Sequence, residues 1–192
     1  PLWTPEDAQH PRESACGLVL RGGADGHAIW SATDAKVDHP SKIIWPEPAA
    51  GDLDGDGAPE AVRSLRAAFA GADALFISTP EYNSSVPGHL KYALDWVSRP
   101  LAASPLRNKP AVVVGASTGA FGAVWAQAEL RKVLASIGAR VVDAEVAAGH
   151  APTRFDEDGT LIDEDLREQL GEVVDALAAA VSERADLART AA

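Results

Sequence analysis

Cysteine, methionine and long apolar runs are scarce in this sequence of 192 residues, and each shortage excludes something. The single cysteine, Cys16, excludes an internal disulfide and a cysteine-cluster metal site, and such cysteine usage is typical of the reducing cytoplasm. No apolar stretch approaches the roughly 20 residues of a membrane-spanning helix. Methionine is absent even from position 1, so we expect a processed chain or a fragment.

Positively charged residues are also few: the sequence has 17 Lys and Arg residues and 28 Asp and Glu residues, which gives a net charge of -11. An acidic chain has no general attraction to nucleic acid phosphates or to anionic lipid. We therefore predict a cytoplasmic protein with a small-molecule partner, and neither a nucleic acid nor a membrane as partner. The length fits one domain, and 46% hydrophobic residues suffice for a core.

From about residue 58 onward, helical and strand-like segments alternate along the chain. Helical periodicity occurs within residues 59–72, 87–100, 123–138 and 164–187, and apolar runs typical of buried strands occur within residues 72–78, 109–117 and 139–147. Strands that are apolar on both faces and alternate with helices form parallel sheets. The pattern therefore predicts an α/β protein with helices on both faces of a parallel sheet.

Residues 1–50 do not share this regularity. Their only strand-like fragment is GLVL, which is followed by RGGADG, and no stretch keeps a period of two or of 3.6 residues. Local and global signals conflict in this segment. We predict a single domain over residues 1–192, in which residues 1–50 are atypical.

The segment DLDGDG raises the question of a metal site. Asp52, Asp54 and Asp56 have the alternate spacing of a calcium loop. The twelfth position of such a loop requires a glutamate, but Arg63 occupies it here. We interpret the segment as an acidic surface turn, with a calcium site as the alternative. The histidines of the first 50 residues lack the spacing of metal ligands, so no metal site is predicted.

The segment GASTG, residues 115–119, follows a predicted strand and precedes a predicted helix. One interpretation is the nucleophile elbow of a serine hydrolase, in which Ser117 is the nucleophile and Asp143 and His150 follow in the order of that fold. The other is a loop that cradles a ligand, since glycines let the backbone approach a flat ring and the hydroxyls and amides donate hydrogen bonds.

A second polar loop, PEYNSS at residues 80–85, follows the preceding predicted strand. In a parallel sheet, loops at the carboxyl ends of adjacent strands lie at one edge, so we expect these two loops to face one crevice. A turn that only caps the next helix accounts for the asparagine and the serines, but not for the bulky Tyr82. The sequence therefore predicts one ligand between the two loops.

Three stretches carry a family resemblance: TPEYNSSVPGHLKYALDWVSRP, KPAVVVGASTGAFGAVWAQAELRKVL and FDEDGTLIDEDLREQL. They closely resemble the NADPH-dependent FMN reductase family of flavodoxin-like proteins, which includes quinone, azo-dye and chromate reductases. The resemblance runs from about residue 51 to the last helix. It implies a flavodoxin-like three-layer α/β/α sandwich, with a parallel, roughly five-stranded sheet and FMN at the strand ends.

The resemblance also implies which residues contact the cofactor. Pro80, Glu81, Tyr82 and Asn83 would line one edge of the flavin ring, and Gly115, Ser117, Thr118 and Gly119 would line the other. No catalytic side chain is implied, because the flavin takes hydride from NAD(P)H and passes electrons to a quinone, azo, chromate or flavin acceptor. The helix within residues 87–100 is implied to pack across a homodimer or homotetramer interface, with Arg99 and Glu81 as partners.

A binding loop for the FMN phosphate is not recognisable in the first 50 residues. Members of the family open with a strand and a Gly-Ser-x-Arg loop, and the nearest analogue here is LVLRGGADG, with Arg21, Gly22 and Gly23 after a short apolar run. Our hypothesis is that the first 45 or so residues are a frame-shifted or otherwise altered form of that segment. The alternative is an inactive or cofactor-free relative. The upstream coding DNA, read in its other frames, tests the hypothesis.

Overall fold

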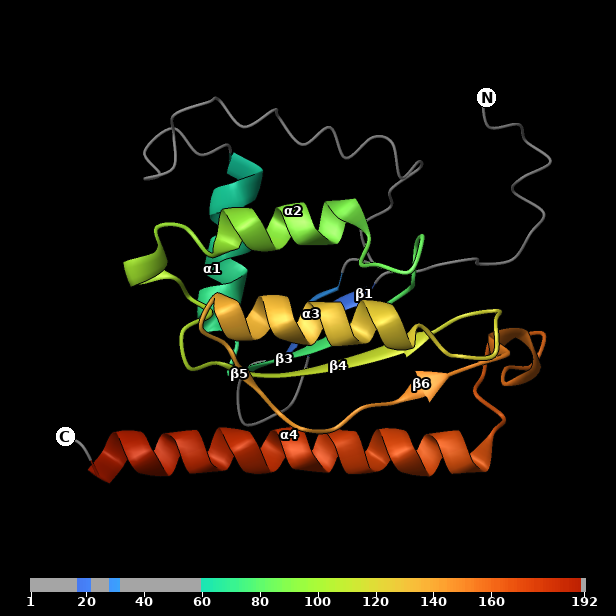
Figure 1. The fold of residues 1–192 in the computed structure, drawn as a ribbon. Coiled ribbons are helices and arrows are strands. Elements are labelled where there is room, and N and C mark those ends of the chain that lie inside the picture. Colours follow the sequence, from blue (N-terminus) through green and yellow to red (C-terminus); the bar gives the residue numbers. More distant parts are fainter. Residues whose placement is uncertain (1–16, 22–27, 32–59, 191–192) are drawn as a thin grey trace.

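The computed structural model describes residues 17–21, 28–31 and 60–190 (Figure 1). Its strands are β1 (Gly17–Arg21), β2 (Ala28–Ser31), β3 (Ala74–Thr79), β4 (Pro110–Ala116), β5 (Arg140–Val141) and β6 (Ala147–Ala148). Its α-helices are α1 (Glu60–Gly71), α2 (Gly88–Val97), α3 (Val124–Ser136) and α4 (Glu164–Thr190), and two short 3₁₀ helices lie at Leu101–Ala103 and Ala151–Thr153. The acidic turn at 52–56 and the glycines at 22 and 23 lie outside the described residues.

The strands form one sheet in the order β2, β1, β3, β4, β5, with β6 also paired to β4. β3 and β4 pair in parallel, from Leu75 opposite Ala111 to Thr79 opposite Gly115. β5 and β6 pair in parallel with the two ends of β4, so they share one position in the sheet. The described sheet therefore has the predicted parallel centre and roughly the predicted width.

The first two strands differ from a wholly parallel sheet. β1 pairs antiparallel with both β2 and β3. Only residues 22–27 connect β1 to β2, whereas a parallel pair needs a connection of a dozen or more residues. The short connection explains why β1 and β2 are antiparallel.

The predicted strand within residues 139–147 is also interrupted, because residues 143–145 leave the sheet between β5 and β6, whereas the Val142 N–H and the Val146 carbonyl still bond to β4. Arg131 of α3 binds this segment, since its Nη2 group donates to the carbonyl of Ala144. The same guanidinium lies 3.7 Å from Asp143 Oδ1 and 3.4 Å from Glu145 Oε2. Contacts from another element thus accompany the interruption of the local strand pattern.

Helices cover both faces of the sheet, as the apolar character of its strands predicts (Figure 1). Successive residues of β4 point to opposite faces. Val113 belongs to a core cluster with buried residues of β3, α1, α2 and α3. Val112 and Val114 belong to a second cluster, with buried residues of α4. The structure is therefore a three-layer α/β/α sandwich.

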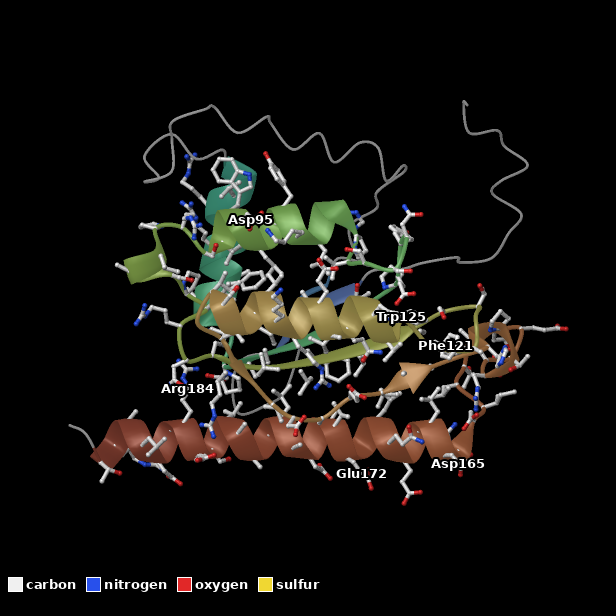
Figure 2. The ribbon with its side chains drawn as sticks, in the orientation of Figure 1. Asp95, Phe121, Trp125, Asp165, Glu172 and Arg184 are labelled. Carbon is white, nitrogen blue, oxygen red and sulfur yellow. The ribbon has the colours of Figure 1, made fainter. Side chains whose placement is uncertain are left out.

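The helix α4 has 27 residues, which corresponds to about 40 Å at 1.5 Å per residue. Its buried residues Leu166, Val173 and Ala180 are spaced seven apart, so a narrow stripe faces the sheet. Arg184 points from α4 toward the sheet, where its Nη1 group donates to the carbonyl of Asp73 at 3.1 Å (Figure 2). No helix within the described ranges is long and apolar enough to cross a membrane.

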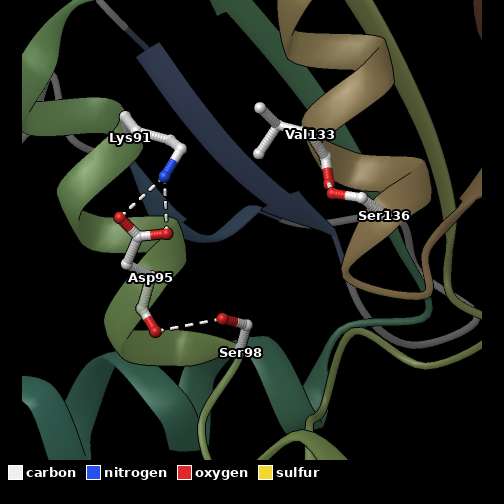
Figure 3. Close-up of polar contacts among 5 residues, drawn as sticks. All are labelled: Lys91, Asp95, Ser98, Val133 and Ser136. Carbon is white, nitrogen blue, oxygen red and sulfur yellow. Dashed lines mark hydrogen bonds and ion pairs between the residues drawn. The ribbon is translucent and has the colours of Figure 1, made fainter.

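Serine hydroxyls bind carbonyls near the ends of α2 and α3 (Figure 3). Ser98 Oγ donates to the carbonyl of Asp95 at 3.0 Å. Ser136 Oγ donates to the carbonyl of Val133 at 2.7 Å. The Lys91 ammonium lies 2.8 Å from the Asp95 carboxylate, one helical turn away on the exposed face of α2. Both helices end with local hydrogen bonds, and both begin at the edge of the sheet where the predicted loops lie.

Candidate functional site

The two loops predicted to hold a ligand lie side by side at the carboxyl edge of β3 and β4 (Figure 1). We call residues 80–85 the first loop and residues 115–122 the second loop. β3 ends at Thr79, which is opposite Gly115 in the parallel register. The two loops therefore leave neighbouring strands in the same direction, and their predicted adjacency is confirmed.

The first loop is a tight hairpin. The backbone N–H of Tyr82 donates to the Ser85 carbonyl at 3.0 Å, and the N–H of Ser85 donates to the Tyr82 carbonyl at 3.1 Å. The two central residues, Asn83 and Ser84, have φ angles of 52° and 60°, as a type I′ turn requires. Asparagine adopts this conformation readily, whereas serine does so less often. The hairpin presents Tyr82 to solvent, with 44% of the residue exposed.

The side chain of Glu81 binds the first turn of α3. Its Oε2 atom accepts hydrogen bonds from the backbone N–H groups of Trp125 at 3.0 Å and Ala126 at 3.1 Å. These N–H groups lack partners within the helix, and the helix dipole favours a negative charge there. At the other end of the first loop, Ser85 Oγ donates a hydrogen bond to Glu129 Oε2 on α3 at 2.5 Å. The polar turn is therefore bonded to α3 at both of its ends.

Backbone hydrogen bonds hold the second loop against the segment that follows β6. The N–H of Ser117 donates to the Ala148 carbonyl at 3.0 Å. In return, the N–H of Ala151 donates to the Ser117 carbonyl at 3.0 Å, and the N–H of His150 donates to the Gly119 carbonyl at 2.9 Å. The position of the second loop thus depends on residues 148–151.

Gly115 faces the protein interior. A Cβ atom on this glycine would lie 2.9 Å from the Ala123 Cβ atom and 3.0 Å from the Thr79 carbonyl oxygen. It would also lie 3.0 Å from Gln127 Nε2. A glycine is needed here because β4 packs closely on α3 at this point. Within the second loop, Thr118 and Gly119 are exposed and Ser117 is half-buried.

The second loop carries free hydrogen-bond donors. Among the described residues, no acceptor is found for the backbone N–H groups of Thr118, Gly119 and Ala120. Their exposed position lets them bind the oxygens of a ligand placed over the loop. This arrangement fits the donor set that the carbonyl groups of a flavin ring require.

Two features near the loops are missing from the sequence prediction. Phe121 and Trp125 stack edge to face, with ring centroids 5.1 Å apart, and they are 64% and 49% exposed beside the start of α3 (Figure 2). Gln127 of α3 is only 1% exposed, and its Nε2 group donates to the Gly122 carbonyl at 3.0 Å. A polar residue among the buried positions Ala126, Leu130 and Leu134 is the sequence signal that points to it.

The residues of the hydrolase alternative do not form a triad. Ser117 Oγ makes its hydrogen bond to the Gly119 carbonyl, at 3.3 Å. Asp143 is fully exposed and lies beside Arg131. Among the described residues, Ser117 Oγ has no hydrogen bond to an imidazole, as a serine nucleophile requires. The hydrolase alternative is therefore not favoured.

Two titratable groups near the sheet have shifted pKa values. Partial burial lowers the pKa of His89, in the first turn of α2. At the other end of β4, burial and the nearby Arg184 lower the pKa of Lys109 to about 8, while Asp73 opposes the shift. Lys109 Nζ donates to the Ala72 carbonyl. This lysine is far from the two loops along β4, and its role is in the fold.

Comparisons with known proteins agree with this geometry. A model of the family described as NADPH-dependent FMN reductase matches residues 37–153, which include both loops. The match begins before residue 51, where the resemblance in the sequence begins. A 2-hydroxy-1,4-benzoquinone reductase of a Burkholderia species is 42% identical over 134 residues, which cover 69% of this chain and 73% of that protein.

A second relative, an NAD(P)H-dependent FMN reductase of Pseudomonas aeruginosa, is 42% identical over 122 residues. The match covers 63% of this chain and 65% of that protein, a little under two thirds. Among solved structures, a flavoenzyme NAD(P)H:(acceptor) oxidoreductase from Paracoccus denitrificans has a TM-score of 0.61 and 35% identity. The match covers 66% of this chain and 70% of the Paracoccus chain, and the likeness confirms the predicted flavodoxin-like fold class.

Proposed function

The chain belongs to the NADPH-dependent FMN reductase family, and from this premise we propose that it is an FMN-dependent NAD(P)H oxidoreductase. When bound, FMN supplies the redox chemistry by taking hydride from NAD(P)H and passing electrons to a quinone, azo, chromate or flavin acceptor. One observation carries the proposal: two loops with exposed polar groups lie at adjacent strand ends and are bonded to the same helix. In open parallel sheets, ligands bind outside the carboxyl ends of the strands.

The protein binds and orients the flavin ring between the two loops. The proposed contacts are Pro80, Glu81, Tyr82 and Asn83 on the first loop and Gly115, Ser117, Thr118 and Gly119 on the second. Exposed Tyr82, Thr118 and Gly119 would contact the ring. Glu81 and Gly115 would position the two loops against α3, since the Glu81 carboxylate binds the backbone N–H groups of α3 and Gly115 packs against that helix.

The free N–H groups of the second loop are proposed to donate to the carbonyl oxygens of the ring. Such donors favour negative charge on the ring, so they raise its affinity for electrons. No side chain would be needed as an acid or a base for the hydride transfer, because the flavin itself would supply that chemistry. Tyr82 and the exposed pair of Phe121 and Trp125 exclude water from the rim of the site.

A homodimer or homotetramer in the cytoplasm completes the proposal. Phe121 and Trp125 expose apolar surface that a second subunit would bury, and Arg99 is exposed at the end of α2. Glu81 Oε2 is engaged with α3, which leaves Oε1 for an arginine across the interface. Sedimentation equilibrium tests this part, and a monomer at micromolar concentration would contradict it.

The first test is a visible absorption spectrum of the purified protein, titrated with FMN and then with NADPH under anaerobic conditions. Flavin bands that bleach on addition of NADPH are the expected result. A colourless protein that does not bind FMN would refute the proposal and favour the inactive relative. Ser117→Ala serves as a second test, because labelling of wild type by a fluorophosphonate and its loss in this variant would favour the hydrolase.

A further inference from the structure

Gln127 is a buried polar residue behind the second loop, and the proposed function does not explain why a polar residue lies there. It lies in the first turn of α3, and Nε2 donates to the Gly122 carbonyl at the end of the second loop, at 3.0 Å. The same nitrogen lies 3.0 Å from the point that a Cβ atom on Gly115 would occupy. Its Oε1 atom has no hydrogen-bond partner among the described residues. One side chain therefore touches both ends of the second loop.

Gly122 has little freedom to move away from Gln127. Its φ angle is 58°, and a Cβ atom there would lie 2.3 Å from the carbonyl carbon of Ala147 in β6. Backbone packing fixes this glycine from one side, and the amide of Gln127 binds its carbonyl from the other. Loss of that amide would leave a buried carbonyl without its donor, which is costly in the protein interior.

The first loop is bonded to the same turn of α3. The N–H groups that donate hydrogen bonds to the Glu81 carboxylate belong to Trp125 and Ala126, which directly precede Gln127 in the sequence. A shift of this turn would displace both loops, because close-packed elements move as units. The first loop and the second loop are thus both bonded to the first turn of α3.

We propose that Gln127 is a positioning residue for the cofactor, which sets the second loop over β4 and couples it, through the first turn of α3, to Glu81 and the first loop. This inference rests on the proposed function. It assigns no contact with FMN to Gln127, because the residue is buried behind the loop.

The main variant is Gln127→Leu, which keeps the side-chain volume and removes the donor. The loss of one buried hydrogen bond predicts that the dissociation constant for FMN rises about 5- to 150-fold. Amide hydrogen exchange in the apoprotein gives a readout that needs no cofactor, and we expect faster exchange confined to the amides of Ser117, His150 and Ala151, whose hydrogen bonds hold the second loop. Gln169→Leu is the matched control, since Gln169 is exposed on α4, and it is expected to leave both measurements unchanged.

A second variant, Gln127→Glu, tests the donor directly. A buried carboxyl group stays protonated to a higher pH than usual, so at about pH 5 it can donate to the Gly122 carbonyl. The ionised form cannot donate. We therefore expect FMN affinity close to wild type at low pH and a loss that approaches that of Gln127→Leu as the pH rises. The charged groups to consider are Arg131, one turn further along α3, and the Glu81 carboxylate at the start of the helix, whereas Gly115, Gly122 and Ala123 carry no titratable side chain.

The coupling is tested by combining Gln127→Leu with Glu81→Gln. Independent residues would multiply their effects on the dissociation constant, whereas residues that support one turn give a combined effect smaller than the product by about 3-fold or more. Multiplicative effects would overturn the coupling.

The outcomes separate the inference from the function. A wild-type protein that binds no FMN would overturn both. A wild-type protein that binds FMN, together with a Gln127→Leu variant of equal affinity, would overturn the inference alone. Faster exchange throughout β4 and α3, rather than at the amides of Ser117, His150 and Ala151, would also overturn it, because it would show a general packing role.

Discussion

The closest backbone approach at the site makes Gly149→Ala the most informative substitution. A Cβ atom on Gly149 would lie 2.2 Å from the Ala120 carbonyl oxygen and 3.2 Å from that of Gly119. Carbon and oxygen atoms in contact are about 3.3 Å apart, so the second loop must move by about 1 Å. Gly149 cannot easily retreat, since its N–H binds the Ala147 carbonyl and its own carbonyl accepts from Arg154 Nε at 3.2 Å.

A displacement of about 1 Å in a group that orients a ligand costs on the order of 100-fold in rate, and overpacking costs about 1–3 kcal/mol of stability. We therefore expect Gly149→Ala to lower NADPH turnover about 100-fold and to lower the free energy of unfolding by about 1–3 kcal/mol. Turnover with a soluble quinone and urea denaturation measure the two effects. A variant with wild-type turnover and stability would refute the reasoning.

Gly171→Ala is the matched control for this prediction. Gly171 is exposed within α4, and a Cβ atom there meets nothing within 4 Å. Alanine is favoured over glycine in a helix interior by about 0.8–1.0 kcal/mol, so this variant is expected to gain up to about 1 kcal/mol of stability. Its turnover should equal that of wild type. The same chemical change thus has opposite expected effects on stability at the two positions.

Three further predictions concern the fold. Because the pKa of Lys109 is lowered to about 8 in the folded state, the free energy of unfolding should rise as the pH increases from about 8 toward the usual lysine value, and Lys109→Met should flatten that rise in urea titrations. The backbone N–H of Leu166 and then the Arg154 side chain lower the pKa of Asp163, so its stabilising contribution is present at pH 7 and is lost as the pH falls through the lowered value. Asp163→Asn should reduce the difference in the free energy of unfolding between pH 7 and pH 3, measured by denaturation. A difference equal to that of wild type would contradict the role given to Asp163. Leu130→Ala should cost about 2–5 kcal/mol in urea denaturation, because Leu130 is fully buried between α3 and the sheet.

Local patterning predicted the elements from residue 60 onward but not all of their pairing. The helices α1 to α3 and the strand β4 fall within the predicted segments, and α4 and β3 match theirs but extend beyond them, to Thr190 and Thr79, because each element carries its own periodicity. The split of the last strand was not predicted, and the residue that binds the segment between its two parts, Arg131, lies on another element. The antiparallel β1 also escaped prediction, because GLVL carries no signal of direction.

The site shows the same division between local and distant information. The adjacency of the two loops followed from the parallel order of the strands, and the structure confirms it. The partner of the Glu81 carboxylate lies 44 residues further along the chain, at Trp125, and no local pattern announces such a contact. The proposed contacts of Tyr82, Thr118 and Gly119 with the ring stay predictions that the FMN titration tests.

The interrupted strand at the end of the sheet bears on how the protein behaves at high concentration. An uninterrupted edge strand offers a row of unpaired N–H and C=O groups, to which a strand of another molecule can add. Here β5 and β6 are two residues long, and the segment between them carries the exposed carboxylates Asp143 and Glu145. Short, bent and charged edges resist such addition. This edge of the described sheet is therefore poorly suited to strand addition, and Arg131 binds the segment that interrupts it.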